Sequence, residues 1–263
     1  MTTDDPDAAK RAMRLRRMMN DRLRTMTPQE RDRTMQVHLA QARGSVRNGD
    51  LLRQAVDRAL DIQVARAGEA GVRPMDDALI YMLCSICDAL EKLDVPYAIT
   101  GSVASSVHGE PFSSLDADLI LVASASEAKT LSTEVSPRFY APEDMLTEAA
   151  RSFSFVNVVD NRTSLKVDLS FVGTDPFLRM ALERRVRTRI GSHPREFWFV
   201  TAEDVILMKL VWRKETQSAK QWENALSVAR VKGARMDWKY LFEQAKNLGI
   251  EEDLIRLRDE AGI

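Results

Sequence analysis

Residues 97–122 read YAITGSVASSVHGEPFSSLDADLILV, and this stretch decides the fold. Residues 97–100 are a short apolar run that predicts a strand, and Gly101-Ser102 follows it directly. We expect a short helical turn as far as His108-Gly109 and a second strand over residues 119–122. The stretch therefore predicts a core that mixes helices and strands, in the order strand, Gly-Ser turn, short helix, strand.

Two carboxylates, Asp116 and Asp118, open the second strand with Ala117 between them. Because successive side chains of a strand alternate between its faces, both point to the same face, about 6–7 Å apart. Two anions in this arrangement repel each other unless a positive charge lies between them. A hard divalent cation with oxygen ligands is the usual partner of such a pair.

A third carboxylate, Asp168, lies in another expected strand, residues 165–172. This strand forms a predicted hairpin with residues 153–159 around a turn at residues 160–162. If it lies beside the Asp-x-Asp strand, the three carboxylates converge. Three carboxylates can hold one or two Mg²⁺ ions, and two ions about 3.5–4 Å apart suit in-line phosphoryl displacement.

The junction at Gly101-Ser102 is a candidate phosphate site. There the free backbone N–H groups and the dipole of the following helix favour an anion. Gly101 lets the backbone approach closely, and Ser102 can cap the helix or donate to a phosphate oxygen. A lone Gly-Ser is usually a turn and a lone Asp-x-Asp a surface pair. The whole order of elements is more restrictive.

The chain divides into three regions. Residues 1–75 have helical patterning that ends at Gly71 and Pro74, residues 76–200 mix helix and strand, and residues 201–263 are helical again. The last region opens with a predicted capping box at residues 201–204. The predicted fold is therefore α+β, a small mixed sheet with flanking helices between a helical N-terminal and a helical C-terminal region.

The spacing of Gly101-Ser102, Asp116-x-Asp118 and Asp168 resembles that of the polymerase-β-type nucleotidyltransferases. Within that superfamily the chain resembles the AbiEii-like and MenT-like branch. The matching stretches are residues 101–110 and 200–210, Gln221-Trp222 and residues 236–241. The resemblance covers roughly residues 76–255, and many members of this branch are toxins of two-gene toxin–antitoxin modules.

The resemblance implies roles for five residues of the central region. Asp116, Asp118 and Asp168 would ligate Mg²⁺, as two ions, and Asp168 could accept the proton of an attacking hydroxyl. Gly101 and Ser102 would hold the triphosphate of an NTP. The fold it implies is the small mixed sheet of a nucleotidyltransferase.

Lys209 is the sixth residue to which the resemblance gives a role, contact with the phosphates. It lies in an apolar run, residues 205–212, so its ammonium needs a partner or a route to water, and a lysine that extends to solvent is the alternative. Relatives often have Arg-x-Thr where this chain has Phe112 and Ser114, and Asp where it has Asn224. These departures leave open the identity of the nucleotide and of the acceptor. To a lesser degree they also leave open whether the protein is active.

The function that follows is Mg²⁺-dependent transfer of a nucleoside monophosphate from an NTP to a hydroxyl acceptor. The acceptor could be tRNA, a protein or a small molecule such as an antibiotic, and the protein could be a toxin with a cognate antitoxin. A basic helix within residues 10–24 slightly favours RNA, although a solvated helix face is the more ordinary explanation of this pattern. The alternative function is a catalytically weak or inactive protein of this fold that binds nucleotide, RNA or a partner protein.

Composition excludes other classes. The 263 residues are 44% apolar with a net charge of −1, which excludes general disorder, and no apolar run is long enough to span a membrane. The acidic first residues, MTTDDPD, indicate no signal peptide, so we expect a cytoplasmic protein.

Cys84-x-x-Cys87 lies in an apolar helical stretch and predicts buried thiols rather than metal ligands. His108 either contacts substrate or bonds to backbone at a helix end. Three tryptophans are expected in the core rather than against bases, Trp212, Trp222 and Trp238.

Overall fold

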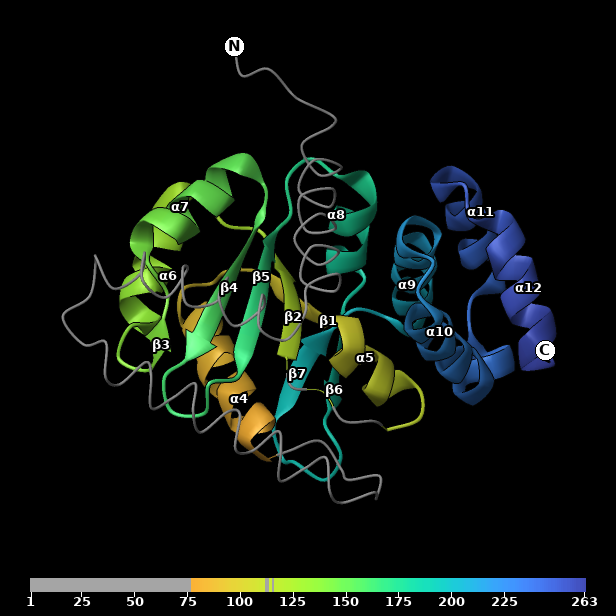
Figure 1. Cartoon of the computed structure of the whole chain (residues 1–263), viewed down its shortest axis with the longest axis horizontal. Helices are drawn as coiled ribbons and strands as arrows, with labels where there is room; N and C mark the ends of the chain where they lie inside the picture. The colour runs from red at the N-terminus through yellow and green to blue at the C-terminus, as the bar shows by residue number, and fades with distance from the viewer. Residues whose placement is uncertain (1–76, 112–113, 115) are drawn as a thin grey trace, which may run out of the picture.

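Strands from the middle of the chain join one sheet, and helices cover it (Figure 1). The computed structural model describes residues 77–111, 114 and 116–263, so the calls on residues 1–75, the basic helix included, lie outside the described residues. The strands are β1 (Tyr97–Thr100), β2 (Asp116–Leu121), β3 (Phe139–Tyr140), β4 (Phe155–Asp160), β5 (Lys166–Phe171), β6 (Val186–Arg189) and β7 (Glu196–Phe199). The helices are α4 (Asp77–Lys92), α5 (Gly101–His108), α6 (Ala125–Val135), α7 (Glu143–Ser152), α8 (Pro176–Glu183), α9 (Ala202–Thr216), α10 (Ala219–Lys232), α11 (Trp238–Leu248) and α12 (Glu251–Ala261), with a 3₁₀ turn at Gly233–Arg235.

The sheet of the described residues is mixed, with the strand order β3-β4-β5-β2-β1-β7-β6. Two pairs of neighbours are parallel, β2 with β5 and β1 with β7, and the others are antiparallel. The expected α+β fold with a mixed sheet is confirmed. The predicted hairpin is also present as β4 and β5, which places Asp168 one strand away from the Asp-x-Asp pair.

The two faces of the central strands differ in polarity. On one face Ala117, Leu119, Val167 and Leu169 are fully buried. The apolar residues of α4 are buried with them in the same cluster: Leu79, Met82, Leu83, Ile86 and Leu90. The alternate residues of the same strands are mostly polar and half-buried or exposed. The sheet therefore has one apolar face in the core and one face that keeps polar side chains near the surface.

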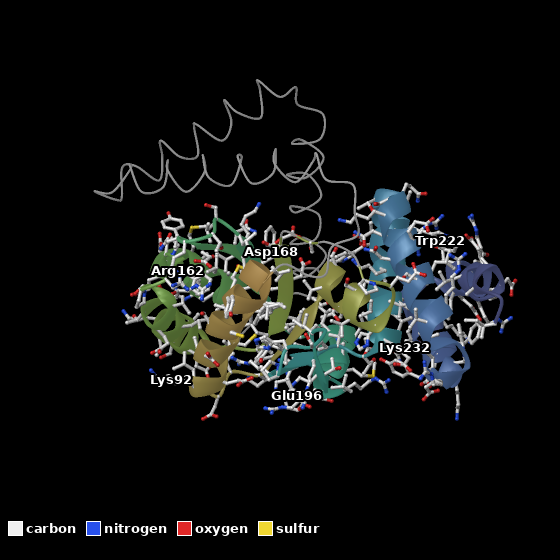
Figure 2. All side chains as sticks on the ribbon, turned by 90° about the horizontal axis from the view of Figure 1, so that it is seen from below. Lys92, Arg162, Asp168, Glu196, Trp222 and Lys232 are labelled. Atoms are coloured by element: carbon white, nitrogen blue, oxygen red, sulfur yellow. The ribbon has the colours of Figure 1, made fainter. Side chains whose placement is uncertain are left out.

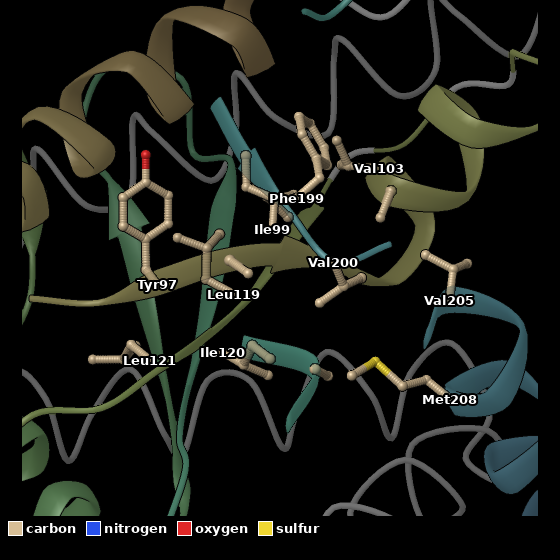
Figure 3. Close-up of a cluster of buried hydrophobic side chains, with 14 of the residues drawn as sticks. Tyr97, Ile99, Val103, Leu119, Ile120, Leu121, Phe199, Val200, Val205 and Met208 are labelled. Carbon is tan, nitrogen blue, oxygen red and sulfur yellow. The ribbon is translucent and has the colours of Figure 1, made fainter. Parts of the chain in front are cut away.

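A second part of the core joins the predicted Gly-Ser junction to the C-terminal helices. Figure 3 shows Ile99 of β1, Val103 of α5 and Phe199 of β7 beside Val205 and Met208 of α9. Thr100 Oγ1 also lies 3.1 Å from Met208 Sδ. These contacts set α9 against the end of β1, where α5 begins.

The C-terminal helices start and end where their capping residues predict. Thr201 is the N-cap of α9 and accepts a hydrogen bond from the Asp204 N–H, Asp237 caps α11, and α11 ends at Gly249 with φ +65°. In a capping box the Asp204 side chain would also accept a hydrogen bond from the backbone N–H of the N-cap residue, but here this side chain has other partners. The Asp204 carboxylate accepts hydrogen bonds from the hydroxyls of Thr201 (2.7 Å) and Tyr240 (2.6 Å) instead.

Asp204 thereby joins three elements. Its carboxylate is fully buried, binds Tyr240 of α11 and lies 3.4 Å from Arg184 Nε at the end of α8. The Arg184 guanidinium also stacks 3.7 Å from the centre of the Tyr240 ring. Burial raises the pKa of Asp204, although the two hydroxyls and Arg184 oppose this shift. The cluster fixes the start of α9 between the sheet and the last helices.

Several elements were not predicted individually, among them α6, β3, α7, α8 and β6. Two of them carry start signals in the sequence. Ser124 and Glu127 form a complete capping box at α6, and Asp175 caps α8 with Pro176 at its first turn. None of the helices in the described residues is both long enough and apolar enough to cross a membrane.

A buried ion pair holds the turn of the β4–β5 hairpin. Asp160 is fully buried, and its Oδ2 lies 2.6 Å from Arg138 Nη2. The same carboxylate accepts hydrogen bonds from the Arg162 N–H and the Thr163 hydroxyl, both 3.0 Å long. Burial alone would raise the pKa of Asp160. Arg138 and the other donors outweigh the effect of burial, so the pKa lies below its ordinary value.

We expect Asp160→Ala to lower the free energy of unfolding by about 3–5 kcal/mol at pH 7, because Arg138 loses its buried partner. Since the pKa is lowered in the folded state, this stabilisation is complete above the ordinary value of 3.8. It should disappear as the pH falls through the folded pKa. Urea unfolding from pH 7 to pH 3 measures both effects. Asp259→Ala, at an exposed site on α12, should change stability by less than about 0.5 kcal/mol, and equal losses in both variants would contradict the prediction.

Candidate active site

Three predicted carboxylates lie on the polar face of the sheet. Asp118 of β2 pairs in register with Asp168 of β5, so the two side chains lie on the same face of neighbouring strands, about 4.8 Å apart at the backbone. Asp116 is two residues earlier on β2 and shares that face. In Figure 2 Asp168 lies over the sheet, while Trp222 marks the separate group of C-terminal helices. The condition for convergence, that the two strands are neighbours, is therefore met.

The two outer carboxylates have polar neighbours that donate to them. Ser114 Oγ lies 3.1 Å from Asp116 Oδ1 and also bonds to the backbone carbonyl of Asp116. On the other strand, β5, Asp168 Oδ1 accepts a hydrogen bond from Asn157 Nδ2. Both contacts are side-chain hydrogen bonds to the kind of oxygen that would ligate a cation.

The three carboxylates suit a divalent cation in ligand type but not in their arrangement. Carboxylate oxygens on one face are the hard ligands that Mg²⁺ prefers, so the residue types fit. In the part of the chain that the structure describes, however, no three His, Cys, Asp or Glu side chains are gathered around one metal position.

Gly101 lies directly against Asp118. Its φ is +63°, and a Cβ at this position would lie 2.0 Å from Asp118 Oδ2. Thr100, the residue before it, pairs with Asp118 across β1 and β2. Only glycine meets both requirements, the left-handed backbone and the close approach. The structure therefore brings the predicted phosphate turn, at the start of α5, into contact with the middle carboxylate.

Ser102 and Lys209 belong to two helices that contact each other, α5 and α9. Ser102 is half-buried in the first turn of α5, next to Gly101. Lys209 lies on α9 beside Met208, which contacts Thr100, and only 2% of Lys209 is exposed. Its Nζ is 5.4 Å from the centre of the Trp212 ring. Burial of this extent does not fit a lysine whose ammonium extends to bulk water, so the alternative of an ordinary solvent-seeking lysine is not supported.

The other candidates have structural roles. His108 Nε2 lies 2.8 Å from the Val200 carbonyl, and burial lowers the pKa of this histidine. Cys87 is buried with a pKa raised to about 12 by burial, and the partly buried Cys84 is also a free thiol. Trp222 is buried in the core and Trp212 and Trp238 are half-buried. Phe112 lies outside the described residues, whereas Asn224 is buried on α10.

Asn157 was missed by the sequence analysis. The predicted hairpin brings residues 153–159 beside residues 165–172, but it does not fix their register, and it is the structure that pairs Asn157 with Asp168. Val156 and Val158 on either side are buried, so the alternation of the strand also assigns Asn157 to the polar face.

Comparison with known proteins gives similarities at the level of solved structures. The antibiotic-resistance factor ANT(2'')-Ia aligns over 69% of this chain and 100% of its own, with 14% identity and a TM-score of 0.46. An antigenic nucleotidyltransferase-like protein from Paracoccidioides brasiliensis aligns over 72% of this chain and 95% of its own, with 13% identity and a TM-score of 0.43. No protein-family model and no curated protein matches the chain.

We expect Gly101→Ala to damage the site more than its backbone strain alone explains. A Cβ in the left-handed region costs about 1–2 kcal/mol, and at this position it would also displace the Asp118 carboxylate. Gly191→Ala is the matched control, because its φ is +54° and its Cβ would have nothing within 4 Å. Urea unfolding and the binding of Mn²⁺ with an NTP analogue compare the two. Only Gly101→Ala should lose binding, and similar behaviour of both variants would argue against the contact.

Proposed function

We propose that the protein is a nucleotidyltransferase that uses Mg²⁺ to transfer a nucleoside monophosphate from an NTP to a hydroxyl acceptor. One observation carries the proposal. Asp118 and Asp168 are register partners on parallel strands, with Asp116 on the same face and the Gly101 turn in contact with Asp118. Carboxylates beside a backbone turn that opens a helix combine the two features that metal-assisted phosphoryl transfer needs, cation ligands and a place for phosphate.

In this proposal each residue acts at a defined point of the nucleotide. Gly101 and Ser102, at the N-terminal end of α5, hold phosphate oxygens through backbone N–H groups and the Ser102 hydroxyl. Lys209 would neutralise phosphate charge from α9. Asp116, Asp118 and Asp168 would hold Mg²⁺, which when bound supplies neutralisation of the charge on the leaving pyrophosphate.

The chemistry is a single displacement at the α-phosphorus. The acceptor oxygen forms a bond to phosphorus, the bond to the oxygen that bridges to the β-phosphate breaks, and pyrophosphate leaves. The proton of the acceptor hydroxyl passes to the Asp168 carboxylate, which faces the same side of the sheet as Asp118. The identity of the NTP and of the acceptor, whether tRNA, protein or small molecule, is the open part of the proposal.

A role as a toxin, with a cognate antitoxin as partner, rests on the resemblance to the AbiEii-like and MenT-like branch and stays a prediction. The cytoplasmic setting is likewise a prediction. The alternative of a nucleotide-binding protein with little or no activity has one structural observation in its favour, namely that the described carboxylates are not gathered around a metal position.

We expect Asp118→Asn and Asp168→Asn each to reduce transfer of label from an α-labelled NTP by about 10²–10³-fold, since each removes an anionic oxygen from the site. The assay supplies each of the four NTPs, Mg²⁺ and three acceptor pools: total tRNA, cell protein and small hydroxyl compounds. Asp259→Asn, on the exposed surface of α12, is the matched control and should transfer label like the wild type.

Two results would contradict the proposal in different ways. Wild-type protein that binds an NTP in the presence of Mg²⁺ but labels none of the acceptors would favour the binding protein. Wild-type protein that neither binds an NTP nor transfers label would remove both functions.

A further inference from the structure

A side chain that the proposed chemistry does not use lies at the end of the carboxylate row. Asn157 of β4 pairs in register with Asp168 of β5, and its Nδ2 donates a hydrogen bond to Asp168 Oδ1. The polar face of the sheet therefore carries a continuous row across four neighbouring strands, in the order Thr100, Asp118, Asp168 and Asn157.

Packing does not explain an asparagine at this position. Val156 and Val158 fill the apolar face on either side of it and are buried, whereas Asn157 is half-buried on the polar face. Asparagine is also a poor strand residue compared with the valines around it. What the amide supplies that valine or leucine would not is a neutral N–H donor directed at Asp168.

We propose that Asn157 is a positioning residue that holds Asp168 in the orientation needed to ligate a divalent cation. The inference rests on the proposed function, because it concerns the same carboxylates. The amide binds Oδ1 of Asp168, which limits rotation of a carboxylate that lies beside Asp118 in the sheet. Groups that orient the ligands of a metal in this way change its affinity without touching it.

The other two carboxylates of the candidate site, Asp116 and Asp118, support this role, because each of them also has a neighbour that limits its movement. Ser114 Oγ lies 3.1 Å from Asp116 Oδ1, and the Gly101 backbone lies against the Asp118 carboxylate.

The simplest competing explanation is that Asn157 only strengthens the pairing of β4 with β5. The two explanations differ in what they change, because a contact that only stabilises the sheet alters the free energy of unfolding but not the affinity of the folded protein for a metal. Asn157→Val and Asn157→Thr separate them. Both side chains are β-branched and suit a strand, they have nearly the same shape, and only threonine keeps a hydroxyl that can donate to Asp168.

The experiment measures Mn²⁺ binding to the full chain without nucleotide, from the electron paramagnetic resonance signal of free Mn²⁺. We expect Asn157→Val to raise the dissociation constant by about 10- to 100-fold and Asn157→Thr to stay close to the wild type. In the transfer assay kcat should fall in Asn157→Val alone, with KM for the NTP unchanged in both variants. Thermal unfolding checks that both variants are folded.

Equal Mn²⁺ affinity in the wild type and both variants would overturn the inference. An equal loss of Mn²⁺ affinity in both folded variants would also overturn it. The fate of the proposed function is separate. Suppose that the wild type transfers no label but Asn157→Val still weakens Mn²⁺ binding relative to Asn157→Thr. The positioning role of Asn157 is then supported, and the proposed transfer reaction is wrong. If the wild type binds no Mn²⁺, both proposals are wrong.

Discussion

The parallel pairing of β2 with β5 is the constraint on which the site depends. It sets Asp118 beside Asp168, an arrangement that is unfavourable by itself, because two carboxylates on neighbouring strands repel each other. On the opposite face the same pairing buries Leu119 and Leu169 completely, and each such side chain contributes about 1.5–3 kcal/mol. The apolar face therefore offsets the repulsion, and the polar face is free to carry charge.

The helices at the end of the chain act on this site through α9. Asp204 ties the start of α9 to α8 and α11 by buried contacts, and Met208, one turn further along, contacts Thr100 at the end of β1. Lys209 is thereby held in the core with little exposure. The C-terminal region is part of the structural support of the proposed phosphate site, although none of its residues belongs to the sheet.

Local signals in the sequence were enough to predict many elements of the described residues. The strand at residues 97–100, the helix that follows Gly101 and the start of α9 at Thr201 depend on side chains and backbone angles within a few residues. Helix α6 shows that such signals also occur where no prediction was made, at Ser124 and Glu127. These elements agree with the structure because short-range interactions decide them.

Properties that depend on distant contacts could not be predicted in the same way. Alternation along β5 assigns Asp168 to a polar face, but which strand lies beside β5 is decided by packing that the local sequence does not contain. The direction of each carboxylate is harder still, because it depends on single neighbours such as Ser114 and Asn157. The positions of Asp116, Asp118 and Asp168 on a polar face of the sheet could therefore be predicted from the sequence. The hydrogen-bonding partners of these carboxylates could not.

The separation of Asp118 and Asp168 along the chain also affects when the site can form during synthesis. The segment from β1 to β2 is short and can assemble early, but β5 must leave the ribosome and close a long loop before the carboxylates meet. Contacts of such high contact order are slow to form. A nascent chain that has not reached Lys166 therefore holds the Gly101 turn without its full set of acidic groups, and the proposed activity must await the addition of β5 to the sheet.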